Sequence, residues 1–146
     1  MNYKARAAIE HPFLNEFINL VDATAPDGIP STTILLSEPF TKFRHNLIIY
    51  RHEPDLKDFR VILFGTEVVE SYGEDWSGRL LSEVGFEKGY EIIYQVNLEL
   101  LDGGARTADS GNLKRHFSDY KSWHEIKMPL RRNGEVTEIL VFMCFS

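Results

Sequence analysis

The chain has 146 residues, of which 43% are hydrophobic and 26% are charged, values typical of a single folded domain and not of a disordered segment. Sixteen basic residues against 22 acidic ones give a net charge of −6, which opposes binding to nucleic-acid phosphates. The single cysteine, Cys144, excludes an internal disulfide and a zinc site built from several thiolates.

No stretch approaches the roughly 18–20 consecutive apolar residues that a membrane-spanning helix needs. The N-terminal stretch MNYKARAAIEHPF also lacks the apolar core of a signal peptide. We therefore expect a cytoplasmic protein with neither a membrane partner nor a nucleic-acid partner.

The first predicted element is an amphipathic helix over residues 12–22. Pro12 suits the first turn of a helix. Four apolar side chains recur at helical spacing, namely Leu14, Phe17, Ile18 and Val21. The prolines and the glycine within 22–32 then predict a connector.

A short helix and a pair of strands are predicted next. Ser37 is placed as the N-cap of a helix over 37–43, with Pro39 in its first turn. Residues 45–52 and 58–64 are rich in β-branched and aromatic side chains, and the stretch EPDLK between them fits a hairpin loop.

Three glycines punctuate the stretch FRVILFGTEVVESYGEDWSGR, which covers residues 59–79. Their spacing matches neither of the common phosphate-binding motifs, and the acidic residues around them would repel an anion. We interpret the glycines as caps and turns. Gly73 ends a short helix over 66–72 in a left-handed conformation, and Ser77-Gly78 opens another short helix at 79–84.

Residues 90–101 fit two templates equally well. Apolar side chains alternate with polar ones as in a strand, yet they also recur at helical spacing. The length of the segment favours a helix, and Gly103-Gly104 suits its end. The residues alone leave the choice open.

From residue 105 onward the chain is predicted to form strands. Residues 105–113 make a weak, polar strand suited to a sheet edge, and 114–119 connect it to an alternating strand over 120–130. A turn at Asn133-Gly134 leads into 136–145, which is apolar on both faces. Such a strand must be covered on both sides, by the middle helices on one and by the N-terminal helix on the other. The order of elements predicts an α+β domain with an antiparallel sheet.

Motifs for catalysis or metal binding are missing from the sequence. The five histidines lack metal-ligand spacing, no nucleophile elbow surrounds a serine, and no carboxylate pair lies in an apolar context. We therefore predict no catalytic residue, no metal site and no enzyme activity. His124 stands out because it alternates with Ile126 and Met128. It is either a core histidine bonded to a carbonyl or a polar group that points into a ligand cavity.

Aromatic residues gather in sequence around the predicted short helices. They are Phe64, Tyr72, Trp76, Tyr90 and Tyr94. Most such side chains pack in a core, whereas some line the walls of a pocket.

The stretch 59–84 resembles the first half of a PAS domain: a strand, a short helix, a turn, and a Gly-Arg pair that opens the next short helix. It is most similar to small single-domain bacterial PAS proteins, which also close on a strand pair like MPLRRNGEVTEIL at 128–140. The resemblance covers 30–146, which leaves 1–29 as an N-terminal helix and connector. It implies a five-stranded antiparallel sheet with short helices on one face, and a long helix over 86–101.

The resemblance implies a sensory function without catalysis. PAS domains hold a small ligand or cofactor between sheet and helices, and its presence changes contacts within a dimer or with a partner protein. Haem-binding members use a histidine on the long helix, which 86–101 lacks. Flavin-binding light sensors use a cysteine on the helical side of the pocket, whereas Cys144 is on the last strand.

We therefore expect a non-covalent ligand of unknown identity, or a cavity filled by side chains. The residues expected to line this cavity are Trp76, Tyr94, His124 and Met128. Output is expected through a homodimer that uses the N-terminal helix, through an unidentified partner protein, or through both.

Two alternatives belong to other function classes. One is a small α+β enzyme that resembles the steroid-isomerase-like cone fold, which would need a buried Asp or Glu near a tyrosine in a pocket. The order of the short helices argues against it. The other alternative is a dimerisation module with a filled core and no ligand.

Overall fold

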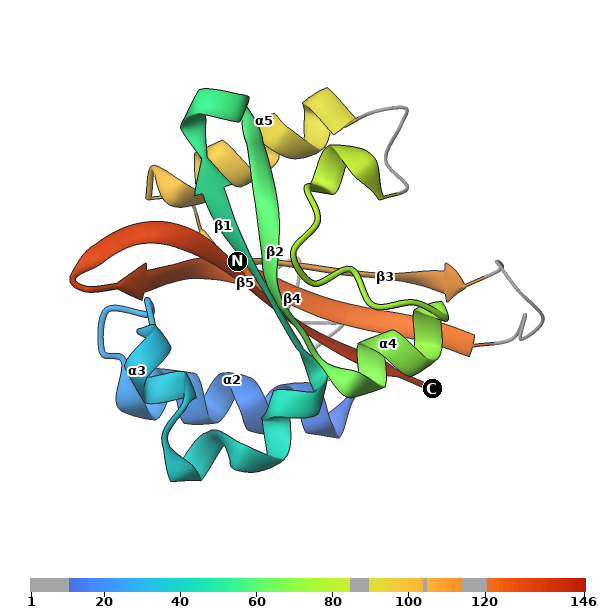
Figure 1. Cartoon of the computed structure of the whole chain (residues 1–146). Helices are drawn as coiled ribbons and strands as arrows, with labels where there is room; N and C mark the ends of the chain where they lie inside the picture. The colour runs from blue at the N-terminus through green and yellow to red at the C-terminus, as the bar shows by residue number, and fades with distance from the viewer. Residues whose placement is uncertain (1–10, 85–89, 104, 114–120) are drawn as a thin grey trace.

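A computed structural model of the protein describes residues 11–84, 90–103, 105–113 and 121–146. These residues form one five-stranded antiparallel sheet with the strand order β2-β1-β5-β4-β3, and helices cover both of its faces (Figure 1). The prediction of an α+β domain built on a five-stranded antiparallel sheet is confirmed.

The five strands follow the predicted segments closely. They are β1 (Leu47–Glu53), β2 (Asp58–Phe64), β3 (Thr107–Leu113), β4 (Lys121–Arg132) and β5 (Glu135–Phe145). The strand β3 lies at an edge of the sheet, as its polar sequence predicts. The β4–β5 turn has positive φ at both Asn133 and Gly134, which is the geometry that an Asn-Gly hairpin favours. The predicted connector 114–119 lies outside the described residues.

Within the described residues, several helical segments accompany the sheet. They are α2 (Pro12–Thr24), α3 (Thr32–Leu35), the 3-10 helix η1 (Glu38–Asn46), α4 (Thr66–Tyr72), the 3-10 turn η3 (Leu81–Glu83) and α5 (Tyr90–Leu101), and a further 3-10 turn, η2 (Pro54–Leu56), closes the β1–β2 hairpin. The ambiguous segment 90–101 is therefore helical. Residues 86–89 of the predicted helix lie outside the described residues.

Two local predictions before β1 need correction. The predicted helix over 37–43 is a 3-10 helix that continues to Asn46, so β1 begins at Leu47 rather than at residue 45. The Ser37 side chain does not cap this helix, because its hydroxyl instead donates to the carbonyl of Ile34 at 2.5 Å. That bond closes α3, a short helix absent from the prediction.

The central strand β5 is buried on both faces, and α2 covers one of them (Figure 1). The rings of Phe17 on α2 and Phe142 on β5 are stacked with their centroids 4.2 Å apart. Leu14 and Val21, one turn away on either side, are also fully buried. The N-terminal helix therefore belongs to the same hydrophobic core as the sheet.

The helices α4 and α5 lie over the opposite face of the sheet, together with Trp76, Leu81 and Val84 from the chain between them (Figure 1). Ile139, Val141 and Met143 of β5 point into this second core, alternating with the residues that face α2. The prediction that the N-terminal helix and the middle helices would cover opposite faces of this strand is confirmed.

A buried carboxylate joins α3 to the sheet. The Glu138 side chain on β5 is fully buried and accepts hydrogen bonds from Arg132 Nε at 2.6 Å and from Thr32 Oγ1 at 3.3 Å. Burying a carboxylate is costly unless hydrogen-bond donors replace its water, and these two donors do so for Glu138. The start of α3 is thus held against β5.

Gly65 lies where the end of β2 approaches the chain just before β1. Its backbone N–H donates to the carbonyl of Leu47 at 2.8 Å. A Cβ atom at this position would lie 2.3 Å from the carbonyl oxygen of His45 and 2.9 Å from that of Arg44. Only a residue without a side chain fits here, because the atoms in the way belong to the backbone.

Replacing Gly65 by alanine should destabilise the fold by about 3 kcal/mol, the upper end of the usual cost of overpacking. The matched control is Gly78→Ala. A Cβ at Gly78 would meet no atom within 4 Å, so only the left-handed backbone (φ +84°) adds a cost, roughly 1–2 kcal/mol. Urea unfolding of the two variants measures the difference, and equal losses would contradict the close approach at Gly65.

Candidate functional site

A cavity of about 270 Å³ lies between the sheet and the helices α4 and α5. All five strands contribute to its walls, as do α4, α5 and two residues between these helices, Trp76 and Leu81. The lining residues are Ile48, Tyr50, Phe64, Tyr72, Trp76, Leu81, Ile93, Asp109, Trp123, Glu125, Lys127 and Met143. A few polar groups among aromatic and aliphatic walls are typical of a small-molecule site.

The glycines of 59–79 place Trp76 in this wall. Gly73 ends α4 with φ +89°, and its N–H donates to the carbonyl of Val69, so the predicted left-handed cap is confirmed. The chain then returns along the edge of β2, where Gly78 N–H donates to the carbonyl of Val61 at 2.7 Å and Val61 N–H to that of Arg79 at 2.9 Å. These bonds hold the intervening turn, and Trp76 with it, against the sheet.

Trp76 is the centre of the aromatic end of the cavity. Its ring is stacked on Phe64 at 5.2 Å and meets Tyr72 edge to face at 5.1 Å. The side chain of Trp76 is 5% exposed, so the indole belongs to the interior. The Tyr72 hydroxyl donates to the sulfur of Met143 at 3.7 Å. Three of the five aromatic residues grouped in the sequence thus meet in one wall.

The other end of the cavity is polar and is built on β3 and β4. Asp109, Glu125 and Lys127 line it, and the Tyr50 hydroxyl is fully enclosed nearby. Burial raises the pKa of Tyr50 well above its usual value, and the negative charge of Glu125 adds to the effect. The ammonium of Lys127 donates to Oδ1 of Asn97 at 3.2 Å. Asn97 is fully buried, and its Nδ2 has no hydrogen-bond partner among the residues that the structure describes.

Trp123 lies flat over the edge strand at this polar end. A Cβ atom on Gly111, its cross-strand neighbour, would lie 2.7 Å from Cζ2 of the indole. The absence of a side chain at Gly111 therefore leaves room for the ring to lie across β3.

Polar anchors hold the helix α5 on the β1–β2 hairpin. The Tyr90 hydroxyl donates to Oδ1 of Asp58 at 2.5 Å, and Ser82 donates to the same carboxylate through both its N–H and its hydroxyl. One turn along α5, the Tyr94 hydroxyl is 3.1 Å from Nε2 of His52. Burial, and then the bond to Asp58, raise the pKa of Tyr90.

The four residues that the sequence suggested for a cavity do not surround one space. Trp76 lines the cavity described above, and Tyr94 lies on the same side of the sheet, bonded to His52. Met128 is fully buried in the core under α2, on the opposite face. His124 shares that face, and its ring lies 5.2 Å from the ring of His11. The buried Cys144 also faces α2, and burial raises the pKa of its thiol to about 12.

Sequence reasoning missed the polar end of the cavity. The alternation over 120–130 separates Trp123, Glu125 and Lys127 from His124 and Met128, but it does not show which set faces the middle helices. The cross-strand position of Asp109 depends on the register of β3, which the sequence pattern leaves undetermined.

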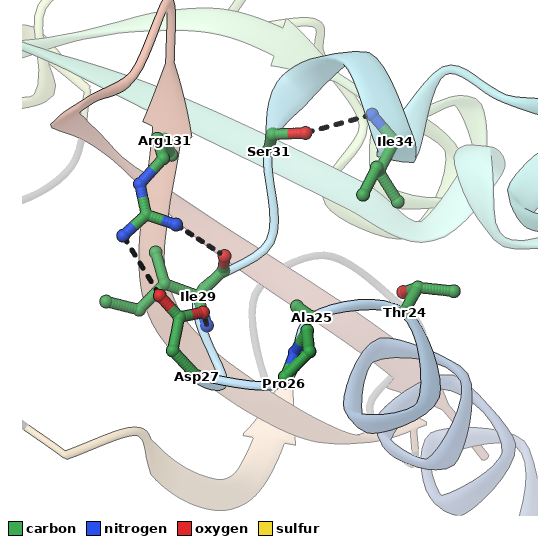
Figure 2. A pocket seen from close by; sticks show the side chains of 8 residues that line it. All are labelled: Thr24, Ala25, Pro26, Asp27, Ile29, Ser31, Ile34 and Arg131. Carbon is green, nitrogen blue, oxygen red and sulfur yellow. Dashed lines mark hydrogen bonds and ion pairs between the residues drawn. The ribbon is translucent and has the colours of Figure 1, made fainter.

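A second, more open cleft of about 450 Å³ lies where the connector between α2 and α3 meets β4 (Figure 2). The Arg131 guanidinium donates to Oδ2 of Asp27 at 3.1 Å and to the carbonyl of Ile29 at 3.3 Å. Ser31 caps α3 by accepting from the N–H of Ile34. Because these polar groups bond one another, we regard this cleft as a structural clamp on the connector.

In the part of the chain that the structure describes, no three His, Cys, Asp or Glu side chains gather closely enough to hold a metal ion. No helix within the same residues has the length and apolar character needed to cross a bilayer.

This chain is similar to known proteins in its structure but not detectably in its sequence. No protein-family model matches the sequence, and no curated protein matches it. A light-oxygen-voltage domain studied with a flavin analogue is similar, with a TM-score of 0.52 and 16% identity over 77% of this chain and 87% of that one. A sensory-box sensor histidine kinase from Vibrio cholerae gives a TM-score of 0.49 at 15% identity, covering 79% of this chain and 92% of that one. At such identities only the fold is shared.

Acidification should weaken the fold through His52. Burial lowers the pKa of His52 from 6.5, with Glu53 acting in the opposite direction. The native state therefore binds fewer protons here than the unfolded chain, so the stability that depends on neutral His52 is full above pH 6.5 and is lost as the pH falls below that value. The urea midpoint should drop between about pH 7.5 and about pH 5.5, the range in which histidine titrates.

The variant His52→Gln should show a smaller drop in the urea midpoint over the same range. Part of the pH dependence will persist, because the pKa of His11 is lowered as well. The control is His45→Gln, which changes an exposed histidine bonded to Thr66 and should keep the full dependence. An unchanged drop in His52→Gln would show that His52 does not couple folding to pH.

Proposed function

Because the chain has the PAS fold, we propose that it is a sensory domain that binds a small molecule non-covalently in the cavity between its sheet and its helices. The observation that carries this proposal is the cavity itself, in which aromatic walls at one end face charged groups at the other. Such a division of apolar and polar lining orients a ligand as well as holding it.

The proposed ligand contacts centre on Trp76, with Phe64 and Tyr72 beside it. The sequence-based candidates His124 and Met128 are left out of the proposed site because they lie on the face that α2 covers. A covalent flavin adduct of the kind formed in light sensors has no support from this chain. Its only cysteine is buried on that same far face, with its pKa raised.

The helix α5 is the element best placed to transmit the effect of a ligand in the cavity to the surface of the protein. Ile93 lines the cavity, while the preceding residue, Ile92, is 70% exposed on the outer surface of the same helix. A ligand that favours one position of α5 over another shifts the population of the two states by its difference in affinity. We place the contact with an unidentified partner protein at this outer surface.

A homodimer through the N-terminal helix remains a proposal. The apolar side of α2 packs on its own sheet, so such a dimer would use the outward side, where Glu16, Asn19 and Asp22 are exposed. We propose that the protein acts in the cytoplasm.

The chain does not adopt the cone fold that the alternative enzyme would need. A buried carboxylate beside a tyrosine, which that alternative needed, does occur at Asp58 and Tyr90. The carboxylate, however, accepts four hydrogen bonds from Phe59, Ser82 and Tyr90, and it does not line the cavity. We therefore assign Asp58 a structural role.

Native mass spectrometry of the purified protein, followed by the same measurement after denaturation, tests the function. We expect an extra mass that leaves on denaturation. The variant Ile93→Trp, which narrows the cavity, should lose this mass, whereas Met128→Leu, on the far face, should keep it. Far-UV circular dichroism checks that both variants fold.

Two outcomes would contradict these expectations. If the wild-type protein carries no extra mass and gains no thermal stability from a library of single-ring compounds, the sensory proposal fails and the ligand-free interaction module is favoured. Loss of the bound mass in both variants would show that the molecule does not occupy this cavity.

A further inference from the structure

The Tyr50 hydroxyl is a buried polar group that lies at the cavity without a protein partner. Tyr50 is on β1, is only 8% exposed, and lines the cavity on the side that α4 and α5 cover. Among the residues that the structure describes, its hydroxyl forms no hydrogen bond. Three other tyrosine hydroxyls on this side of the sheet are bonded, those of Tyr72, Tyr90 and Tyr94. A buried hydroxyl without a partner is costly, so its presence here calls for a ligand group that bonds it.

The charges that act on the Tyr50 hydroxyl place it between the two walls of the cavity. Burial raises its pKa most, and the negative charges of Glu125 and Tyr72 add to the effect. Glu125 is on the sheet and Tyr72 is on α4, and both line the cavity. Because the raised pKa keeps the proton on the oxygen, the hydroxyl offers an O–H donor to whatever enters the space between these walls.

The remaining walls define the shape and size of a ligand. The rings of Phe64 and Trp76 are stacked with an interplanar angle of 25°, and Tyr72 meets Trp76 edge to face. Aromatic surfaces of this kind favour a flat aromatic body, which can stack on them or meet them edge to face. The cavity volume of about 270 Å³ is below the roughly 300–1,000 Å³ of sites for drug-sized ligands, so the ligand has one or two rings.

We propose that the ligand of this cavity is an uncharged aromatic compound of one or two rings, whose carbonyl oxygen or ring nitrogen accepts a hydrogen bond from the Tyr50 hydroxyl while its ring packs against Trp76 and Phe64. This inference rests on the proposed function and names its ligand class. The ligand is uncharged because an ion beside so deeply buried a hydroxyl would lose its water, at a cost that one hydrogen bond does not return. Tyr50 is thus the residue that selects and orients the ligand.

Two probes of the same shape test the proposal by ligand-observed NMR titration. They are acetophenone, which has a carbonyl acceptor, and α-methylstyrene, in which a CH₂ group replaces the carbonyl oxygen. We expect Tyr50→Phe to weaken acetophenone binding about tenfold, the effect of losing one hydrogen bond to a buried group. Binding of α-methylstyrene should not weaken, so the ratio of the two affinities shifts about tenfold between the proteins.

Urea unfolding of the same variant separates a ligand-binding role from a structural one. Because the Tyr50 hydroxyl bonds no described residue, Tyr50→Phe should keep or raise the urea midpoint. The matched control is Tyr94→Phe, which removes the same atom from a tyrosine that bonds His52 and does not line the cavity. This control should lower the urea midpoint and keep the affinity ratio of the wild-type protein.

The outcomes that would overturn the proposal differ from those that would overturn the sensory function. An affinity ratio that Tyr50→Phe leaves unchanged would show that the hydroxyl does not bond the ligand. A large fall in the urea midpoint of Tyr50→Phe would show that the hydroxyl has a structural role instead. If neither probe binds although native mass spectrometry finds a retained molecule, the proposed ligand class fails and the sensory function stands.

Discussion

The strand β5 is the part on which the rest of the structure depends. It pairs with β1 on one side and with β4 on the other, and its side chains are buried on both faces. An apolar strand in that position is stable only when both faces of the sheet are covered. The stack of Phe17 on Phe142 provides one cover, and the second core around Val141 and Met143 provides the other. The sheet therefore separates the core under α2 from the core that contains the cavity.

Much of the fold follows from sequence patterns because they report burial directly. The alternation over 120–130 and the doubly apolar run 136–145 predict the strands that form the middle of the sheet. The segment 90–101 was ambiguous because Ile92 and Val96 fit a strand face, yet in the helix they are exposed while Asn97 is fully buried. Only contacts with the sheet decide between these arrangements. The short helix α3 depends on one cap, Ser31, which is too local a signal to stand out in a connector.

The candidate site was less predictable than the fold. Trp76 was predicted to line a cavity because glycines and aromatic residues surround it in sequence, and its position in the structure follows from backbone bonds to β2. His124 and Met128 lie on the face of the sheet that α2 covers, and alternation defines two faces without saying which helices cover each one. The pair Asp109 and Glu125 is brought together by strand register alone. A site assembled from separate strands in this way has no motif in any single segment of the sequence.

The position of β5 also has a consequence for how the chain acquires its structure. This strand follows the other four in chain order, and it pairs Leu47 with Phe142 across most of the sequence. Until that pairing forms, α2 lacks the strand on which Phe17 stacks, and the β1–β2 hairpin has no central neighbour. When the central strand of a sheet comes last among its strands, many contacts join residues that are far apart in the sequence. Such a high contact order slows folding and leaves apolar and aromatic side chains exposed during synthesis. The intermediates that most need protection from aggregation are thus those that lack β5.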